Sequence, residues 1–225
     1  MSSIDSNQDL TRIRREYLAE SFDEQDLQEQ PHQQFHRWFE QHRQLDPANA
    51  TAMVLATASE QGLPSARIVL LKHFDQGGYC WYTDYRSLKG QQLAANPQAE
   101  LLFYWPELDR QVRISGQVEK LERASAEQYF SERPRGSQLS AAISHQSHPV
   151  ADRQQLERQV ESLERKLDGD AVCCPQQWGG YRLVPQRYEF WQGRENRLHD
   201  RLVYSLDQDI EGQERDAWRI QRLAP

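Results

Sequence analysis

The sequence predicts a mainly β protein in which an antiparallel sheet or barrel carries added helices. Short runs of apolar, β-branched or aromatic residues follow one another between residues 51 and 120 and return after residue 185, separated by turn-forming stretches such as "EQGLP" and "DQGG". Helical patterns are grouped before and between these runs instead of alternating with single strands. We therefore expect antiparallel pairing, because parallel neighbours need a long crossover, usually a helix, between successive strands.

Length and composition favour one domain preceded by an arm. The chain has 225 residues, of which 37% are hydrophobic, and a formal net charge of −7. These values are typical of a folded, mildly acidic, water-soluble protein, and they disfavour non-specific binding to nucleic acid. We expect residues 1–30 to form a mobile N-terminal arm, because "FDEQDLQEQ" is too polar to build a core. Residues 31–225 are expected to form a single domain.

The sequence gives no sign of a membrane, secretory or metal-binding protein. No stretch is apolar for long enough to cross a bilayer, and "MSSIDSNQDLTRIRREY" contains no apolar signal core. We expect a cytoplasmic protein without membrane contact. Cys80, Cys173 and Cys174 form an odd set without paired ligand spacing, which argues against a disulfide framework and a zinc site.

The elements of the first half follow from residue spacing. Phe35, Trp38 and Phe39 recur at helical spacing and predict an amphipathic helix from Gln33 to near Asp46 and Pro47. Strands are then predicted over "TAMVLATAS", "SARIVLLKHF", "GYCWYTD" and "AELLFYW". In "RQVRISGQVEKLE" polar and apolar residues alternate, as expected for a half-buried antiparallel strand.

The second half begins with helices and ends with strands. Residues 124–144 predict two short helices interrupted at "RPRGS", where proline and glycine oppose continuation. Residues 152–167 predict a charged helix with a single apolar stripe. The last predicted strands are "QRYEFWQG", "DRLVYSL" and "AWRIQRL", with a polar turn through "DQDIEGQERD" before the final one.

The stretch "GRENRLHDR" concentrates cationic side chains beside aromatic residues. If it is extended, Arg197, His199 and Arg201 lie on one face and suit an anionic or electron-rich ligand. The alternative is a solvated edge on which Asp200 and Glu195 pair locally, and composition alone favours it. The neighbouring aromatic pair, Phe190 and Trp191, shifts the balance back toward a ligand pocket.

Two cations interrupt the apolar run "SARIVLLKH". If its strand is central, Arg67 must be paired or must hold an anion. Five residues separate Arg67 from Lys72, so in a regular strand their side chains face opposite sides. We expect them to serve two different groups rather than one phosphate.

Other polar stretches are compatible with phosphate. In "YTDYRSLKG", Thr83, Ser87 and Lys89 lie near a predicted helix start, which indicates either an anion site or ordinary capping by Asp84 or Ser87. "ERPRGSQ" and "HQSH" add further donors, namely Arg133, Arg135, Ser137, Gln146 and Ser147. Each stretch is ambiguous alone. In an acidic protein, their sum predicts more than one bound anionic group.

Several long motifs in order resemble one enzyme family. These are "RIVLLKHFD", "WYTDYRSLKGQQLAANP", "RQVRISGQVEKL", "YFSERPRGSQLSAAISHQS", "WGGYRLVPQRYEFWQG", "RLHDRLVY" and "AWRIQRLAP". Together they resemble the pyridoxine (pyridoxamine) 5′-phosphate oxidase family over roughly residues 47–225, and "RREY" at 14–17 resembles the arm that covers its substrate. The resemblance implies an antiparallel, FMN-binding split β-barrel and a homodimer with two FMN molecules at its interface.

The resemblance also implies an activity and a site. The enzyme would oxidise pyridoxine or pyridoxamine 5′-phosphate to pyridoxal 5′-phosphate, pass the electrons to oxygen and release hydrogen peroxide. Arg197 and His199 would be the catalytic residues. FMN would be held by Arg67, Ile68, Val69, Leu70, Leu71, Lys72, Tyr82, Thr83, Lys89, Gln111, Gln146, Ser147, Trp191 and Arg201. Substrate would be held by Arg14, Tyr17, Lys72, Tyr129, Arg133, Ser137, Arg197, Leu198 and His199.

Three positions depart from the family pattern. Leu88 stands where the family often has an arginine, and Arg86 is the candidate substitute. Asn49 stands where an aspartate is expected near the active site, and "FDEQ" at 22–25 is acidic where the arm is expected to be basic. Two other functions stay open: a flavin-binding reductase with a changed substrate, and a non-catalytic carrier of FMN or pyridoxal phosphate.

Overall fold

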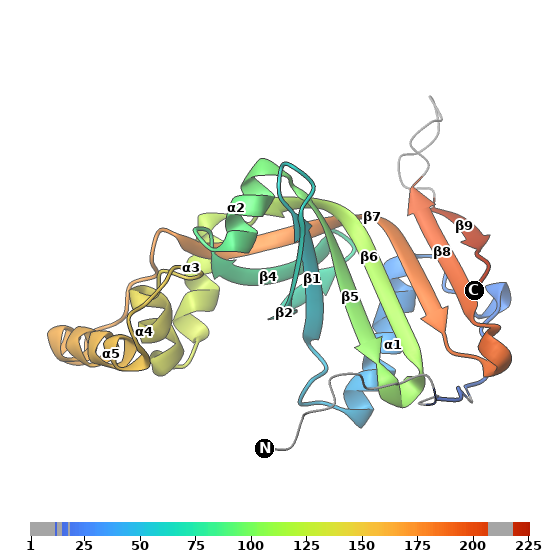
Figure 1. Ribbon diagram of the computed structural model, residues 1–225, viewed down its shortest axis with the longest axis horizontal. Helices are drawn as coiled ribbons and strands as arrows, with labels where there is room; N and C mark the ends of the chain where they lie inside the picture. Colours follow the sequence, from blue (N-terminus) through green and yellow to red (C-terminus); the bar gives the residue numbers. More distant parts are fainter. Residues whose placement is uncertain (1–11, 13–14, 18, 207–217) are drawn as a thin grey trace, which may run out of the picture.

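The protein is built on one curled antiparallel sheet, as the sequence predicts. The computed structural model describes residues 12, 15–17, 19–206 and 218–225. Its nine-stranded sheet has the order β2-β1-β5-β6-β7-β4-β3, while β8 pairs with β7 and β9 pairs with β8 (Figure 1). The strands are β1 (Ala52–Ala58), β2 (Pro64–Leu70), β3 (His73–Asp75), β4 (Gly78–Asp84), β5 (Gln98–Trp105), β6 (Arg110–Lys120), β7 (Trp178–Gln192), β8 (Asp200–Leu206) and β9 (Trp218–Arg222).

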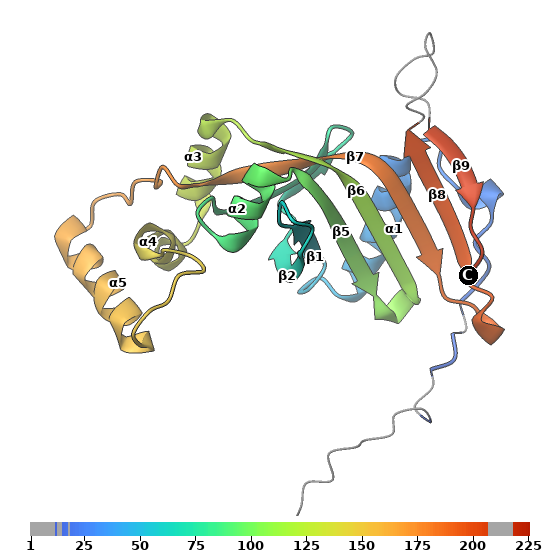
Figure 2. The same ribbon diagram turned by 45° about the horizontal axis from the view of Figure 1, so that its top comes forward.

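The helices are added around this sheet. Figure 1 and Figure 2 both show α3, α4 and α5 gathered at one end of the molecule, with β8 and β9 at the other. The helices are α1 (Pro31–Leu45), α2 (Leu88–Ala95), α3 (Arg123–Glu132), α4 (Arg135–Ile143) and α5 (Arg153–Leu167), and the 3-10 turns are η1 (Glu24–Asp26), η2 (Pro106–Leu108) and η3 (Glu195–Arg197). Within the described ranges, none of the helices has the length and apolar character needed to span a membrane.

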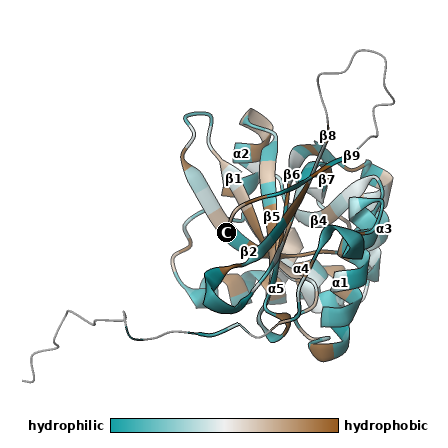
Figure 3. Ribbon diagram, turned by 90° about the vertical axis from the view of Figure 1, so that its right-hand side faces the viewer, coloured by the Kyte–Doolittle hydropathy of each residue, from teal (hydrophilic) through white to brown (hydrophobic). Residues whose placement is uncertain are grey.

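Helix α1 covers the core of the sheet. It begins at Pro31, two residues before the predicted start, because the fixed φ of proline suits the first helical position. Phe35 is fully buried, with its ring centroid 4.9 Å from those of both Tyr79 and Phe103. Much of the rest of α1 is hydrophilic (Figure 3). The predicted amphipathic helix is therefore confirmed, and its apolar face forms part of the main core.

Part of the predicted arm lies against helix α1. Phe22 is buried, with its ring centroid 4.7 Å from that of Trp38. Burial of an aromatic side chain of this size stabilises the docked segment by about 1.5–3 kcal/mol. The described residues nearest to Phe22 in sequence are therefore fixed to the domain by an apolar contact.

The run "SARIVLLKHF" forms two strands, so the prediction of a single strand is wrong. β2 pairs with β1, whereas β3 pairs with β4. Between them the Leu71 amide donates to the Thr51 carbonyl (2.8 Å) and the Lys72 amide donates to the Cys80 carbonyl (2.9 Å), so the chain changes partners at this point. A continuous apolar run carries no periodicity signal for such a corner. The two-residue alternation therefore does not extend from β2 to Lys72.

Strand β7 is longer than predicted. It begins at Trp178 rather than at Gln186 and contains Pro185, which has no amide hydrogen to donate. The pairing of β6 with β7 shifts register between Ser115 and Gly116, so a bulge absorbs the proline. Gly116 is required there because a Cβ would overlap with the Val184 carbonyl. The glycines and the proline of "WGGYRLVP" disfavour a strand locally, but pairing with β4 and β6 stabilises one.

The remaining expected elements agree with the structure. α3 and α4 are separated at Arg133 and Pro134, and α5 follows at Arg153. β6 buries Val112, Ile114 and Val118 as the alternation predicts. The predicted polar turn at 207–216 lies outside the described residues.

Candidate functional site

A cavity of about 580 Å³ lies between β2, the end of β4, and helices α2, α3 and α4. Residues expected for the cofactor and for the substrate line the same cavity. The expected cofactor residues there are Arg67, Ile68, Val69, Leu70, Lys72, Tyr82, Thr83, Lys89 and Gln146, and the expected substrate residues are Lys72, Tyr129, Arg133 and Ser137. Leu71 is buried behind this wall, and Ser147 lines an adjoining hollow together with Arg67 and Lys89. We call this group the cationic half-site.

Arg67 reaches the cavity from β2, which is an edge strand among the described residues. Its guanidinium donates to the Thr57 hydroxyl (2.7 Å) and to the Leu55 carbonyl (3.0 Å). Burial lowers its pKa. No carboxylate of the described residues forms an ion pair with Arg67, so neutral oxygens position a charge that is left for an anion.

Lys89 lies in the first turn of α2 and is buried. Its ammonium group donates to Gln146 Oε1 (2.7 Å) and to the Thr83 hydroxyl (3.2 Å). Burial, and then the positive charge of Arg67, lower the pKa of Lys89 to about 8. Two cations held this close without a carboxylate counter-ion among the described residues indicate a site for an anionic group.

The start of α2 is capped by serine, and the Lys89 side chain lies beside the cap. Ser87 is the N-cap residue and accepts a hydrogen bond from the Gly90 amide (3.3 Å). The Leu88 amide donates to Ser147 Oγ (3.2 Å), and Ser147 has a left-handed φ of 70°. The predicted capping by Ser87 is confirmed. The anion site stays a prediction, with which the position of Lys89 in the cavity lining is compatible.

Arg86 does not take the place expected for the missing arginine. Its guanidinium forms a bidentate pair with Asp84 (2.7 and 3.0 Å) and also donates to the Ser144 carbonyl (2.8 Å). These bonds hold it outside the set of residues that line the cavity. Leu88 is half exposed and lines the adjoining hollow near Arg67. The suggestion that Arg86 replaces the arginine absent at position 88 is therefore wrong for this conformation.

Three stacked aromatic rings line another part of the cavity, and an arginine packs against one of them. Tyr82 stacks on Tyr129 (centroids 4.2 Å apart) and on Trp178 (5.4 Å). The Arg133 guanidinium lies 4.8 Å from the Trp178 ring centroid, and its Nη1 is buried without a hydrogen-bond partner among the described atoms. Burial lowers the pKa of Arg133. A buried guanidinium N–H without a partner is a donor available to a ligand.

Lys72 and Arg67 line one cavity despite the spacing argument. The corner between β2 and β3 separates them, and Lys72 is exposed at the end where Tyr129, Arg133 and Ser137 lie. The expectation that they face opposite sides of one strand is wrong. The expectation that Arg67 and Lys72 bind two different anionic groups stays a prediction.

A second group of predicted residues lies where β7, η3 and β8 meet, and we call it the aromatic half-site. The rings of Tyr17, Trp191 and His199 contact one another, with centroids 4.7 to 5.5 Å apart. Gly193 makes room for Tyr17, because a Cβ there would lie 2.5 Å from the ring. Arg14 lies outside the described residues.

His199 is held as a neutral ring. The Arg194 amide donates to His199 Nδ1 (3.0 Å), which places the ring proton on Nε2. Burial, and then the charge of Arg197, lower the pKa of His199. A neutral imidazole at neutral pH can donate a hydrogen bond from Nε2 to a ligand atom.

Arg197 does not belong to an extended row with His199 and Arg201. η3 covers Glu195–Arg197, Asn196 and Arg197 have left-handed φ values of 56° and 63°, and β8 begins only at Asp200. The extended alternation predicted for "GRENRLHDR" is wrong, because a tight turn returns the chain after β7. Arg197 still lies 5.8 Å from the Tyr17 ring centroid, and Leu198 is exposed.

Arg201 lies next to Trp191 in the sheet and has a carboxylate partner. It donates to Glu189 Oε1 (2.7 Å), and Glu189 also accepts from Arg187 (2.8 Å) and is buried. Gln111 faces Trp191 across β6 and β7. The predicted local pairing of Asp200 is present, because Arg194 lies 3.7 Å from it, but its shorter pair is with the distant Arg222 (2.7 Å).

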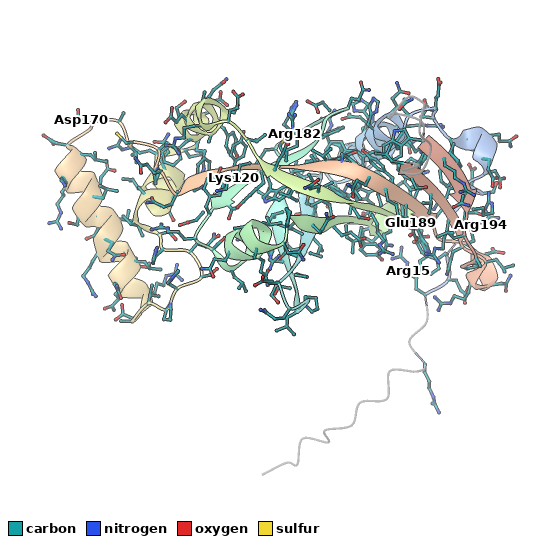
Figure 4. The ribbon with its side chains drawn as sticks, turned by 90° about the horizontal axis from the view of Figure 1, so that it is seen from above. Arg15, Lys120, Asp170, Arg182, Glu189 and Arg194 are labelled. Atoms are coloured by element: carbon teal, nitrogen blue, oxygen red, sulfur yellow. The ribbon has the colours of Figure 1, made fainter. Side chains whose placement is uncertain are left out.

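The two half-sites are separate within one chain. None of the residues of the aromatic half-site lines the cavity of the cationic half-site. In Figure 4, Glu189 and Arg194 lie toward one end of the molecule, while Asp170, which follows α5, lies at the opposite end. The structure thus brings each half of the predicted site together but does not join the halves.

Asn49 takes no part in either half. Its side-chain amide donates to Asp46 (2.9 Å) in the loop before β1. Among the residues described, no cluster of three or more His, Cys, Asp or Glu side chains could hold a metal ion.

Two residues of the site are not among those predicted from the sequence. Trp178 forms the end of the aromatic stack and supports Arg133, and Gly193 admits the Tyr17 ring. Trp178 stands in "WGG", where two glycines beside a tryptophan signal a close approach of other chain segments. Gly193 has no local signal, because its partner is 176 positions away.

Comparison with known proteins gives matches along most of the chain. The family model "Pyridoxamine 5′-phosphate oxidase" matches residues 39–166, and "Pyridoxine 5′-phosphate oxidase C-terminal dimerisation region" matches residues 178–225. A pyridoxine/pyridoxamine 5′-phosphate oxidase 1 of Ralstonia nicotianae is 50% identical over 214 residues, covering 95% of this chain and 97% of the relative. A pyridoxine/pyridoxamine 5′-phosphate oxidase of Trichormus variabilis is 46% identical over 213 residues, with 95% and 97% covered.

A solved structure has the same architecture. PhzG from Burkholderia lata, in complex with tetrahydrophenazine-1-carboxylic acid, superposes with a TM-score of 0.82 at 29% identity, covering 92% of this chain and 99% of that one. This likeness confirms the antiparallel split barrel with added helices. The two family models and the identity of the relatives over nearly their full length lead to one conclusion: this chain belongs to the pyridoxine/pyridoxamine 5′-phosphate oxidase family of enzymes.

Proposed function

We propose that the protein catalyses the FMN-dependent oxidation of pyridoxine 5′-phosphate or pyridoxamine 5′-phosphate to pyridoxal 5′-phosphate, with oxygen as the electron acceptor and hydrogen peroxide as a product. The observation that carries this proposal is a single cavity lined by four cations, Arg67, Lys72, Lys89 and Arg133, none of which has a carboxylate ion-pair partner among the described residues. We assign Arg67 and Lys89 to one set and Lys72 and Arg133 to a second. A phosphorylated cofactor and a phosphorylated substrate would use one set each.

The part of the cavity lined by Arg67 and Lys89 fits the FMN phosphate. Lys89 is buried, and burial together with the charge of Arg67 lowers its pKa to about 8, although the charge of Asp84 offsets part of this effect. A phosphate between Lys89 and Arg67 would offset both the burial cost and their mutual repulsion. The positive end of the α2 dipole favours an anion in the same place. These features support FMN over riboflavin, which has no phosphate.

The part of the cavity lined by Tyr129, Arg133 and Ser137 fits the phosphate of the substrate. Arg133 Nη1 has no partner among the described atoms, Lys72 is exposed beside it, and Tyr129 and Ser137 offer hydroxyl groups. Arg133 is further oriented by Trp178. A pyridine ring whose phosphate is bound at this end would point back along the cavity toward the cofactor.

The aromatic half-site would be supplied by a second copy of the chain. Directly opposite residues in an antiparallel sheet share a face, so Tyr104, Gln111, Trp191 and Arg201 form one row across β5 to β8. The apolar residue Ile68 pairs with Val54 on the same face and is 64% exposed, and Tyr104 is 53% exposed. Exposed apolar surface next to ligand-binding residues indicates an interface, here a two-fold homodimer.

In that dimer each residue has a defined task. FMN supplies the acceptor for a hydride from the substrate carbon, while the protein supplies placement and electrostatics. Arg197 would orient the substrate over the cofactor ring and polarise its oxygen or nitrogen. His199, neutral and protonated on Nε2, would donate a hydrogen bond nearby. Arg201 would favour negative charge on the cofactor ring. Tyr17, packed against Trp191, would exclude water.

The overall reaction balances with oxygen alone for the alcohol, and with oxygen and water for the amine. Oxidation of the alcohol removes a hydride and a proton, and oxygen accepts two electrons and two protons to give hydrogen peroxide. Oxidation of the amine also consumes water and releases ammonia. The test is to mix FMN-loaded protein with each phosphorylated substrate under air and to follow aldehyde and peroxide together. Equal amounts of the two products support the proposal, whereas a yellow protein without turnover supports a carrier of FMN.

A flavin-dependent oxidation of another substrate is the second candidate. It draws on the PhzG complex, in which the bound compound carries a carboxylate and no phosphate. Arg133 and Lys72 favour the phosphorylated vitamin, because a carboxylate requires fewer donors than a phosphate. Turnover of the phosphorylated vitamin that is slower than turnover of a cyclic amino acid or carboxylate would favour this second candidate.

A further inference from the structure

The acidic residues of the arm converge on an arginine near the other end of the chain. Arg222 of β9 pairs with Asp23 (3.0 Å) and with Glu24 (2.9 and 3.0 Å). Figure 1 and Figure 2 show the blue segment that contains η1 beside β9. The acidic character of "FDEQ" therefore has a structural counterpart, which is a cation on the last strand.

The same guanidinium also holds the residue that follows His199. Arg222 Nη1 donates to Asp200 Oδ1 (2.7 Å), and Asp200 Oδ2 accepts from the Phe22 amide (3.0 Å). The Asp200 side chain is only 14% exposed, so its charge is compensated where water is partly excluded. One carboxylate thus receives a hydrogen bond from β9 and another from the arm.

Arg194 forms a second link between the same two segments. Its side chain donates to the Ala19 carbonyl (3.0 Å) and lies 3.7 Å from Asp200, while its backbone amide donates to His199 Nδ1 (3.0 Å). Arm residues 19–24 are therefore joined to the segment 194–200 at two points, Arg194 and Asp200. A displacement of one segment would strain the hydrogen bonds of the other.

We propose that Arg222 is a positioning residue of the aromatic half-site, which holds the arm and the His199 segment together so that Tyr17 and His199 meet the substrate as one unit. The role of Arg222 in catalysis rests on the proposed function, whereas the contacts that join residues 19–24 to residues 194–200 do not. Arg222 contacts neither Tyr17 nor His199 and acts through Asp200, Asp23 and Glu24.

The ion pairs of Arg222 differ in strength, because the acids Asp23, Glu24 and Asp200 differ in solvent exposure. Asp23 and Glu24 are 47% and 57% exposed, so their pairs with Arg222 are individually weak and are screened by salt. Phe22 packs against Trp38 independently of these charges. Removing Arg222 should therefore loosen the two segments relative to each other without releasing the arm or unfolding the domain.

Hydrogen exchange of the full-length, FMN-loaded protein tests the link directly. Arg222→Gln is expected to speed amide exchange severalfold in both 19–27 and 193–200. The double variant Asp23→Asn, Glu24→Gln is expected to do the same to a smaller extent, because Asp200 keeps its pair with Arg222. The matched control is Glu29→Gln, since Glu29 is an exposed acid of the same arm, and it should leave both segments unchanged.

Steady-state kinetics then tests the role in positioning. With pyridoxine 5′-phosphate, Arg222→Gln should raise KM severalfold and change kcat less, and Arg222→Lys should restore part of the loss. Faster exchange in 19–27 alone, with 193–200 and KM at parental values, would overturn the proposal. If Arg222→Gln does not fold, the double variant decides by the same criteria. Because exchange needs no turnover, this outcome is distinct from failure of the proposed function.

Discussion

Lys89 Nζ lies 2.7 Å from Gln146 Oε1, so a neutral amide, rather than a carboxylate, orients a buried ammonium group. The amide fixes the position of the charge without neutralising it. Arg67, the second cation of this end of the cavity, is likewise bound to a hydroxyl and a carbonyl. The cationic half-site is therefore organised before any anion arrives, at the cost of a lowered pKa of Lys89.

The affinity for FMN should depend on pH through Lys89. The pKa of Lys89 is lowered to about 8 in the free protein, and a bound phosphate would raise it. Binding then takes up a proton above pH 8, so the Kd of FMN should be constant below that pH and should increase as pH rises toward 10. Fluorescence titration of FMN measures it. Lys89→Met should bind more weakly, and an equally steep pH dependence in that variant would contradict the assignment.

The same lowered pKa predicts the stability of the protein without FMN. Because the folded pKa lies below the unfolded one, the unfolded chain binds more protons between about pH 8 and 10. The contribution of Lys89 to the free energy of unfolding should therefore increase with pH across this range. Denaturant unfolding of parent and Lys89→Met measures it, and Lys89→Met should lack this increase.

Replacement of Leu88 should strengthen FMN binding. Leu88 is half exposed beside Arg67 and Lys89, and Arg86 is held away by Asp84. Leu88→Arg would add a charged donor at the phosphate end and should lower the Kd of FMN about tenfold. Leu88→Gln, which adds a neutral donor, is the control for polarity. Equal affinity in Leu88→Arg and the parent would show that the phosphate lies elsewhere.

Loss of Arg133 should be specific for phosphorylated substrates. Arg133→Gln removes the donor that has no partner in the described structure and should raise KM for pyridoxine 5′-phosphate by about tenfold or more, because a charge-assisted bond is lost. Turnover of unphosphorylated pyridoxine should hardly change. Arg135→Gln is the control, since Arg135 pairs with Glu164 and does not line the cavity. A parallel loss with both substrates would mean that Arg133 stabilises the fold instead.

Gly193 and Tyr17 should behave as a coupled pair. A Cβ at position 193 would lie 2.5 Å from the Tyr17 ring, so Gly193→Ala should displace Tyr17 from Trp191 and His199 and raise KM. In the Tyr17→Ala background, Gly193→Ala should leave KM almost unchanged. A double-mutant cycle in KM measures this coupling. Fully additive effects would show that Gly193 acts without Tyr17.

The sequence predicted most elements because their burial follows simple periods. The alternation of β6 and the apolar stripe of α1 reflect contact with one core, which residue spacing reports directly. The corner at Leu71 and the bulge at Pro185 were missed, because each depends on which distant strand supplies the next hydrogen bond. Local patterns hold no information about that choice.

For the site, motifs identified residues but not their arrangement. The turn at Asn196 and Arg197 uses left-handed φ values that neither residue type requires, so an extended strand was the natural expectation. The pairing of Arg86 with Asp84 and the contact of Gly193 with Tyr17 are tertiary. The resemblance implied cofactors at a homodimer interface, but residue order alone does not say which predicted residues lie together within one chain.

Mixing of two variants tests most directly whether each site is built from two copies. One variant carries Lys72→Ala and Arg133→Ala in the cationic half-site, and the other carries Arg197→Ala and His199→Ala in the aromatic half-site. Each alone should be nearly inactive with pyridoxine 5′-phosphate. Co-expressed in equal amounts, half of the dimers would be mixed and would contain one intact site, so activity should recover to about a quarter of the parental value. No recovery, with mixed dimers demonstrated by mass, would contradict a site shared between copies.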